Sequence, residues 1–221
     1  MKILFTQWFK ATPEVLTYNL YCLYKNLSNK HIDKIVLFVD NCEFNNIFNE
    51  KLIVVPIQTR LSYKMWMDYA DKEYPEDMKI LSNSDIYFDE SLSFLDQINE
   101  WENRLYVLTR KDLTKDGNII PSSLVYNPNN TEQISPQHCQ DAWIYKNKLK
   151  SDFNNNYNLG VMHCENRFRI SAQESGICVF SLFNNIELTH VDWRGSKVYS
   201  QKGYEFDGIR SELPYFTKDT K

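Results

Sequence analysis

Short apolar segments alternate with amphipathic ones along the first half of this 221-residue chain, and this alternation restricts its fold more than any other feature. The apolar segments have the length of buried strands and end in turn-forming residues. They span residues 2–6, 34–39, 52–57, 78–81 and 104–109. Strands that alternate with helices predict an α/β fold, with a mostly parallel central sheet flanked by helices on both faces.

The segments between these strands carry helix signals. Thr12-Pro13-Glu14 combines a hydroxyl cap, a proline at the first helical position and an acid in the first turn. Leucines at positions 16, 20, 23 and 27 then recur at helical spacing. Residues 62–74, the segment after Asp89 and residues 165–174 also predict helices, with Asp89 as a cap and Gly176 ending the last helix.

The second half of the chain is less regular. Residues 111–140 are rich in Asn, Pro, Gln and Ser, which predicts a long functional loop. Ordered elements are expected at residues 142–145 and 157–162, with short strands at residues 177–182 and 186–188. The polar residues after Trp193 predict a wrapping tail or a lid. Because no linker divides the chain, we expect a single domain over residues 1–221.

Composition limits the setting and the partners of this domain. The formal net charge is −4 and no basic run is present, so nucleic acid is not an expected partner. No apolar stretch approaches the roughly 20 residues that span a bilayer. The five cysteines are scattered without metal or disulfide spacing, which favours reduced thiols and a cytoplasmic protein. The 14 Tyr and 5 Trp residues suit stacking on sugars or bases as well as a core.

Polar residues gather where the predicted strands end, which is where open α/β sheets bind ligands. Acids there are candidate ligands for Mn²⁺ or Mg²⁺, and arginines are candidates for phosphate. The set comprises Thr6-Gln7-Trp8, Asp40-Asn41, Gln58-Thr59-Arg60, Asn83-Ser84-Asp85 and Thr109-Arg110-Lys111. This composition is typical of a nucleotide-phosphate site.

Three segments resemble the glycosyltransferase A-type family, the nucleotide-diphospho-sugar transferases, and most of all its small viral and bacterial domains. Asn83-Ser84-Asp85 stands where that family carries its Asp-x-Asp metal motif. Residues 160–168, followed by Glu174-Ser175-Gly176, resemble the later segment with an acidic pair at a helix start. His190 lies where many members place a second metal ligand. The chain departs from the family at Asn83 and Asn166, which replace acids.

The resemblance implies transfer of a sugar from a nucleotide diphosphate, with UDP favoured, to a carbohydrate or glycoprotein acceptor, with Mn²⁺ or Mg²⁺ required. Residues 1–110 would bind the nucleotide, and residues 111–221 would supply the acceptor side and catalysis. By this resemblance, the metal would be bound by Asp85 and His190, and the nucleoside by Thr6, Gln7 and Asp40. The rest of the donor would be contacted by Arg60, Asn83, Ser84 and Arg110, and the sugar pocket would be shaped by Asp141 and Trp143. The general base would be Glu165, with Asp141 as its competitor.

Each of these residues has a plainer interpretation. Asp85 and Asp141 can accept backbone hydrogen bonds in turns or caps, and Glu165 can be a first-turn acid favoured by the helix dipole. His190 can be a structural histidine, and Arg60 and Arg110 can pair with surface acids. The corresponding alternative function is a non-catalytic carbohydrate-binding or scaffold domain. A nucleotidyltransferase is a further alternative, although the first strand lacks a following glycine-rich phosphate loop.

Overall fold

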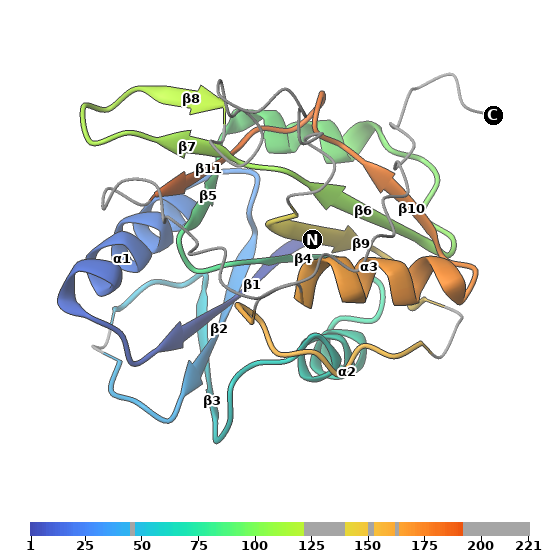
Figure 1. Ribbon diagram of the computed structural model, residues 1–221, viewed down its shortest axis with the longest axis horizontal. Coiled ribbons are helices and arrows are strands. Elements are labelled where there is room, and N and C mark those ends of the chain that lie inside the picture. Colours follow the sequence, from blue (N-terminus) through green and yellow to red (C-terminus); the bar gives the residue numbers. More distant parts are fainter. Residues whose placement is uncertain (45–46, 122–139, 150–152, 162–163, 192–221) are drawn as a thin grey trace, which may run out of the picture.

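The computed structural model describes residues 1–44, 47–121, 140–149, 153–161 and 164–191. Its centre is a seven-stranded sheet with the order β10-β6-β9-β4-β1-β2-β3 (Figure 1). All neighbours in this sheet pair in parallel except β9, which is antiparallel to both β4 and β6. The strands are β1 (Lys2–Phe9), β2 (Lys34–Asp40), β3 (Leu52–Ile57), β4 (Met78–Ser82), β6 (Arg104–Leu108), β9 (Ala142–Tyr145) and β10 (Cys178–Ser181).

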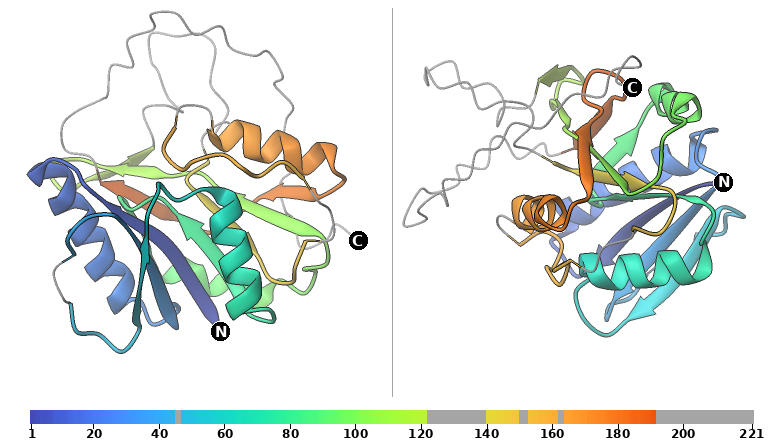
Figure 2. Two further views of the ribbon diagram at one scale, coloured as in Figure 1. Left: turned by 90° about the horizontal axis from the view of Figure 1, so that it is seen from below. Right: turned by 90° about the vertical axis from the view of Figure 1, so that its right-hand side faces the viewer.

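Helices cover both faces of this sheet because its strands are apolar on both sides. On one face, α1 (Pro13–Ser28) and the 3₁₀ helix η1 (Glu90–Gln97) pack against a core that includes Leu4, Leu37 and Ile80. On the other, α2 (Tyr63–Glu73) and α3 (Cys164–Glu174) pack against Phe5 and Leu81. The right-hand view in Figure 2 shows η1 in green and α2 in teal on opposite sides of the sheet. The predicted α/β domain with a mostly parallel sheet is therefore confirmed.

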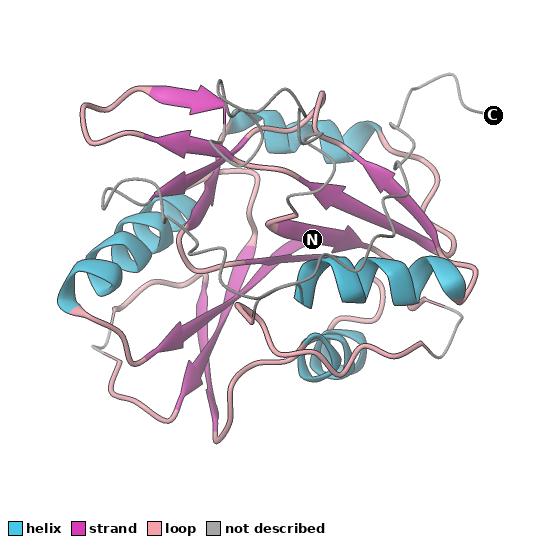
Figure 3. Cartoon of the chain, in the orientation of Figure 1, coloured by secondary structure: helices cyan, strands magenta, loops and turns pink. Residues whose placement is uncertain are grey.

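A second sheet lies beside α1 and is a feature that the sequence pattern did not predict (Figure 3). Its strand order is β5-β11-β7-β8, formed by β5 (Ile86–Phe88), β11 (Leu188–Val191), β7 (Lys111–Leu113) and β8 (Ile119–Pro121). Tyr18 and Cys22 of α1 pack against Leu113 and Val191 of this sheet. The expected loop over residues 111–140 thus begins as a β-hairpin, and residues 122–139 lie outside the described part.

Several predicted boundaries were wrong. Strand β1 continues to Phe9, because its pairing with β2 extends as far as Asp40. The strand predicted at residues 186–188 begins at Leu188 instead, and η1 is a 3₁₀ helix. Residues 157–161 form only an isolated bridge between Asn158 and Ser62. The predicted tail after Trp193 lies outside the described residues, and no helix among those described is both long and apolar enough to cross a membrane.

The predicted helix stop at Gly176 is confirmed. Gly176 has a φ of 82°, in the left-handed region that glycine adopts without a steric penalty. Its N–H donates to the Gln173 carbonyl, and the Ile177 N–H donates to the Ala172 carbonyl, each at 3.0 Å. These bonds satisfy carbonyls at the end of α3 and turn the chain into β10.

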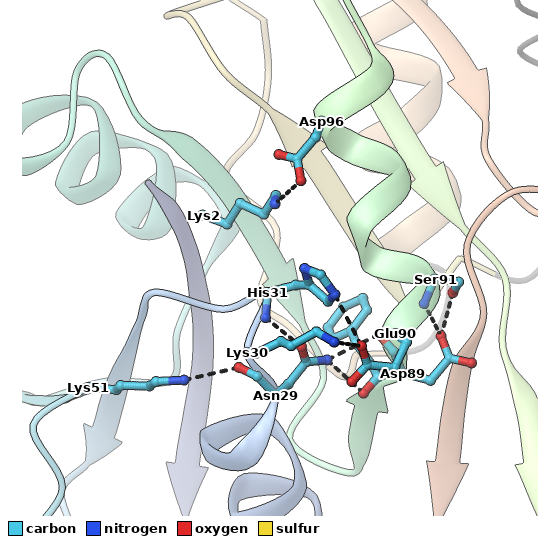
Figure 4. Close-up of polar contacts among 10 residues, drawn as sticks. Lys2, Asn29, Lys30, His31, Lys51, Asp89, Glu90, Ser91 and Asp96 are labelled. Carbon is cyan, nitrogen blue, oxygen red and sulfur yellow. Dashed lines mark hydrogen bonds and ion pairs between the residues drawn. The ribbon is translucent and has the colours of Figure 1, made fainter.

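The predicted cap at Asp89 is also confirmed, and polar contacts fix the start of η1 (Figure 4). The Asp89 side chain accepts a hydrogen bond from the Ser91 N–H at 2.9 Å. Asn29, at the end of α1, donates through Nδ2 to the Phe88 carbonyl at 3.0 Å and to the Asp89 carbonyl at 3.1 Å. Asp89 therefore has a structural role at the start of η1.

Asn26 ties α1 to β5 from within the core. Its Nδ2 donates to the Ile86 carbonyl at 2.9 Å, and its Oδ1 accepts from the Phe88 N–H at 3.0 Å. The side chain is buried, so replacement by alanine leaves two backbone groups without these partners. We expect Asn26→Ala to lower the free energy of unfolding by about 2–4 kcal/mol in chemical denaturation. Ser28→Ala, on the exposed side of α1, is the control, and an equal effect of both substitutions would contradict this role.

Candidate functional site

The candidate site begins at the turn between β4 and β5. Ser84 and Asp85 form this turn, directly after the carboxyl end of β4. Strand β1 lies between β4 on one side and β2 on the other, so the connections reverse direction across the sheet beside this turn. Ligands of open α/β sheets bind at such a reversal. The fold therefore places Asp85 where a ligand would enter.

The structure brings Asp85 and His190 together. Asp85 Oδ2 lies 3.3 Å from His190 Nε2, although the two residues are far apart in the sequence. Their contact follows from strand pairing, since β11 runs antiparallel to β5 with His190 opposite Ile86. The Val191 N–H also donates to the Asp85 carbonyl at 2.9 Å. His190 is only 6% exposed, and its ring faces the β4–β5 turn.

Asp112 is a member of this site that the sequence did not indicate. Its Oδ1 lies 3.0 Å from His190 Nδ1 and accepts a hydrogen bond from Arg110 Nε at 3.2 Å. Asp112 occupies β7, which runs parallel to β11 with Asp112 and His190 as direct partners. The only available signal was its position two residues after Arg110, in a segment predicted to be a loop.

Arg110 links these residues to Asp141. Its Nη1 donates to Asp141 Oδ1 at 2.8 Å, and Asn83 Nδ2 lies 3.3 Å from the same oxygen. The Asp141 N–H donates to the Leu108 carbonyl at 2.9 Å, which anchors the residue just before β9. Asp141 is 4% exposed, so Arg110 and Asn83 compensate for the burial of its charge.

Five side chains therefore form a row of alternating charge, which we call the charged row: Asp85, His190, Asp112, Arg110 and Asp141. Burial lowers the pKa of His190, but hydrogen bonds to Asp112 and Asp85 outweigh that effect and raise the pKa to about 9. A protonated imidazole between two carboxylates gives favourable contacts along the whole row.

The donor atoms at one end of the row fit a divalent cation. Asp85 offers a carboxylate oxygen, which suits Mn²⁺. His190 would offer Nε2 as a second ligand atom once the cation displaces the proton of the imidazolium. No group of three or more acidic, His or Cys side chains that could hold a metal is present among the described residues. A cation here would have two protein ligands and take the remainder from phosphate oxygens and water, as Mg²⁺ commonly does at nucleotide sites.

Glu165 lies in the first turn of α3, near Asp141 and Arg110. Burial raises the pKa of Glu165, and the negative charge of Asp141 adds to this effect. Hydrogen bonding to the backbone at the helix start and the charge of Arg110 oppose it, leaving a pKa of about 7. A carboxylate with this pKa can accept a proton near neutral pH, as a general base must.

The raised pKa of Glu165 predicts a pH-dependent stability. Between its ordinary value of 4.5 and its folded value of about 7, the folded chain holds a proton that the unfolded chain has released. Stability therefore falls as pH rises through this window and stays lower above it. We expect Glu165→Gln to gain about 2–3 kcal/mol relative to wild type between about pH 5 and about pH 8.

Chemical denaturation of both proteins at each pH measures this gain. Glu174→Gln, at the exposed end of the same helix, is the control because it removes an exposed acid, whereas Glu165 is half-buried. If wild type and Glu165→Gln changed in parallel with pH, the raised pKa of Glu165 would be contradicted.

The residues predicted to hold the nucleoside lie on β1 and β2. Thr6 and Gln7 are inside β1 and buried, rather than beyond its end. Within the described part of the chain, the Thr6 hydroxyl and Gln7 Oε1 are buried atoms with no hydrogen-bond partner. Asp40 is half-buried at the end of β2, and Asn41 follows it with a φ of 39°.

Arg60 and Trp143 have different positions relative to solvent. The exposed guanidinium of Arg60 lies 5.7 Å from the ring centroid of Phe9 and packs against Gly160, where an added Cβ would come within 2.6 Å of its Nη2.

Trp143 is 0% exposed, with its ring centroid 4.9 Å from that of Tyr63. The prediction that the Trp143 ring shapes a sugar pocket is therefore wrong, because no part of the ring is exposed. Strand β9 lies between β4 and β6, and this central position buries both of its faces.

No protein-family model and no curated protein matches the sequence, but solved structures match the fold. GalNAc-T7 with UDP, GalNAc and Mn²⁺ superposes with a TM-score of 0.56 and 11% identity, over 89% of this chain and 45% of that one. TarS 1-349 of S. aureus with UDP-GlcNAc gives a TM-score of 0.51 and 12% identity, over 89% of this chain and 60% of that one.

The chain has the glycosyltransferase A-type fold. A putative glucose-1-phosphate thymidylyltransferase from Bacillus anthracis also shares it, with a TM-score of 0.50 and 9% identity over 86% of this chain and 89% of that one. The chain spans about half the length of the glycosyltransferases that it matches.

Proposed function

We propose that this protein transfers a sugar from a nucleoside diphosphate, with UDP favoured, to a hydroxyl of a carbohydrate or glycoprotein acceptor. The observation that carries the proposal is the meeting of Asp85 and His190 at the switch point of the sheet, 3.3 Å apart. Residues 1–110 would bind the nucleotide, and the second half would supply His190 and Glu165. Four free cysteines among the described residues suit the proposed cytoplasmic location.

Asp85 and His190 would hold Mn²⁺ or Mg²⁺ against the diphosphate of the donor. When bound, the cation would neutralise the charge that grows on the leaving nucleoside diphosphate. Asn83 and Ser84, beside Asp85, would contact the donor. The exposed guanidinium of Arg60 would steady the diphosphate.

Thr6 and Gln7 of β1 would contact the nucleoside. The Thr6 hydroxyl and Gln7 Oε1 are buried atoms without a protein partner among the described residues, and such atoms gain free energy when they find one. Asp40, at the end of the neighbouring strand β2, would add a contact to the ribose or the base. Arg110 would act mainly by holding Asp141 at the sugar side of the site.

Glu165 would take the proton from the acceptor hydroxyl as the new glycosidic bond forms. Its pKa of about 7 suits this role, and Asp141 is less suited because Arg110 and Asn83 already occupy its Oδ1. This assignment requires a reaction that inverts the anomeric centre, since a retaining reaction needs no such base.

Product analysis tests the proposed reaction. We expect a mixture of UDP-sugars, Mn²⁺ and oligosaccharide acceptors to release UDP at a rate that depends on the acceptor. A nucleotidyltransferase, the activity named for the Bacillus anthracis structure, would instead release pyrophosphate from a nucleoside triphosphate and a sugar phosphate. Pyrophosphate release without UDP release would overturn the proposal, and the absence of both reactions would favour a non-catalytic carbohydrate-binding or scaffold domain.

A further inference from the structure

We propose that Asp112 is a positioning residue that holds the His190 ring with Nε2 toward Asp85, and thereby builds the cation site from the second sheet. This inference rests on the proposed function, because it concerns the cation that the donor diphosphate would share. It gives a role to the β7–β8 hairpin, which the resemblance did not address.

Strand register makes Asp112 a direct neighbour of His190. The two residues are partners on the parallel strands β7 and β11, so their side chains leave the same face of the sheet side by side. Asp112 Oδ1 lies 3.0 Å from His190 Nδ1, on the opposite side of the ring from Nε2. The Asp112 carboxylate is therefore placed to orient the ring without blocking the nitrogen that faces Asp85.

The chemistry of imidazole explains why this contact matters. The His190 imidazolium must release one proton to bind a metal, and the neutral ring then binds through the nitrogen that carries no hydrogen. A carboxylate that accepts a hydrogen bond from Nδ1–H leaves Nε2 as the ligand and fixes the direction of its lone pair. Asp85 Oδ2, 3.3 Å from Nε2, supplies the second donor atom.

Asp112 is itself held in place by Arg110. The Arg110 Nε–H donates to Asp112 Oδ1 at 3.2 Å, while Nη1 of the same guanidinium donates to Asp141 at 2.8 Å. Arg110 is thus anchored on both sides and limits the movement of the Asp112 carboxylate. Asp141 thus holds Arg110, Arg110 holds Asp112, and Asp112 holds the His190 ring in one orientation.

Manganese binding separates a positioning role from a merely stabilising one. Mn²⁺ is titrated into the full chain with saturating UDP, and free Mn²⁺ is followed by electron paramagnetic resonance. We expect Asp112→Ala to weaken Mn²⁺ binding by about 10–100-fold, the usual cost of losing a carboxylate that orients a ligating histidine. Asp116→Ala removes an exposed acid from the turn of the same hairpin, so it should bind Mn²⁺ as wild type does.

A double-mutant cycle with His190→Ala shows whether Asp112 acts through the histidine. We expect Asp112→Ala to have no further effect on Mn²⁺ affinity when His190 is already alanine. Wild-type affinity in the folded Asp112→Ala protein, or an equal loss in the His190→Ala background, would overturn the inference. Asp112→Asn is the substitute in both arms if circular dichroism shows that Asp112→Ala is unfolded.

The same titration distinguishes failure of this inference from failure of the proposed function. If wild type binds Mn²⁺ with UDP and Asp112→Ala binds it equally well, only the role of Asp112 falls. If wild type binds no Mn²⁺ in the presence of UDP, the metal-dependent function falls, and the positioning role falls with it.

Discussion

Replacement of Glu165 by glutamine is expected to lower the rate of sugar transfer by about 10²–10⁴-fold, the usual contribution of a general base. The carboxamide keeps the size of the side chain but cannot accept the proton of the acceptor hydroxyl. The site should keep its shape, so binding of UDP should change little. Initial rates of UDP release at saturating donor and acceptor measure the effect.

The pH profile of the wild-type rate gives a second view of the same residue. Because the pKa of Glu165 is about 7, the rate should fall as pH drops below that value and the carboxylate becomes protonated. Glu174→Gln should keep both the rate and the profile, since Glu174 lies at the exposed end of α3. Turnover within a few-fold of wild type in Glu165→Gln would exclude this base and favour either a retaining reaction or Asp141.

Replacement of Asp85 by alanine is expected to weaken Mn²⁺-dependent binding of UDP by about 100-fold or more. Loss of an outer-shell partner costs about 10–100-fold in metal affinity, and loss of a direct ligand should cost at least as much. Competition against a fluorescent UDP analogue, with and without Mn²⁺, measures the change. His190→Ala should act in the same direction, because both side chains would bind the same ion.

A control for this prediction is Asp96→Ala. The Asp96 carboxylate ion-pairs with Lys2 at 2.7 Å and is mostly exposed near the end of η1 (Figure 4). Its removal changes the net charge as Asp85→Ala does, but at a surface site. Equal losses of UDP affinity in both variants would show that overall charge, rather than metal ligation by Asp85, controls binding.

The main sheet could be predicted because its signals are local. Strands β1, β2, β3, β4 and β6 each lie in a mainly apolar segment of the sequence. Helices or loops of ordinary length separate these segments. The placement of Asp85 at a strand end followed from such a run and from the rule that ligands bind there. His190 was added by resemblance alone, and its contact with Asp85 depends on a strand pairing that joins distant parts of the chain.

The second sheet could not be predicted for the same reason. Its strand β7 has only three residues, Lys-Asp-Leu, too few for an alternating pattern to emerge. Its partner β11 lies far along the chain, so no local propensity marks the pairing. Asp112 was therefore missed, although it makes two of the contacts in the charged row.

Trp143 shows how a correct strand can still mislead. The segment from Ala142 to Tyr145 was expected to be ordered, and a tryptophan after a polar loop suggested a ring exposed to sugar. In the sheet, β9 fits antiparallel between β4 and β6, and its four residues are all buried. Burial on both faces depends on where a strand lies in the sheet, and the strand's own residues do not specify that position.

Calorimetric titration of UDP and GDP into the wild-type protein, each with and without Mn²⁺, is the most direct test of the proposed donor site. We expect UDP to bind in the presence of Mn²⁺, its binding to weaken strongly without the metal, and GDP to bind less tightly. If neither nucleotide bound under any of these conditions, the proposed nucleotide-sugar site at Asp85 and His190 would be contradicted.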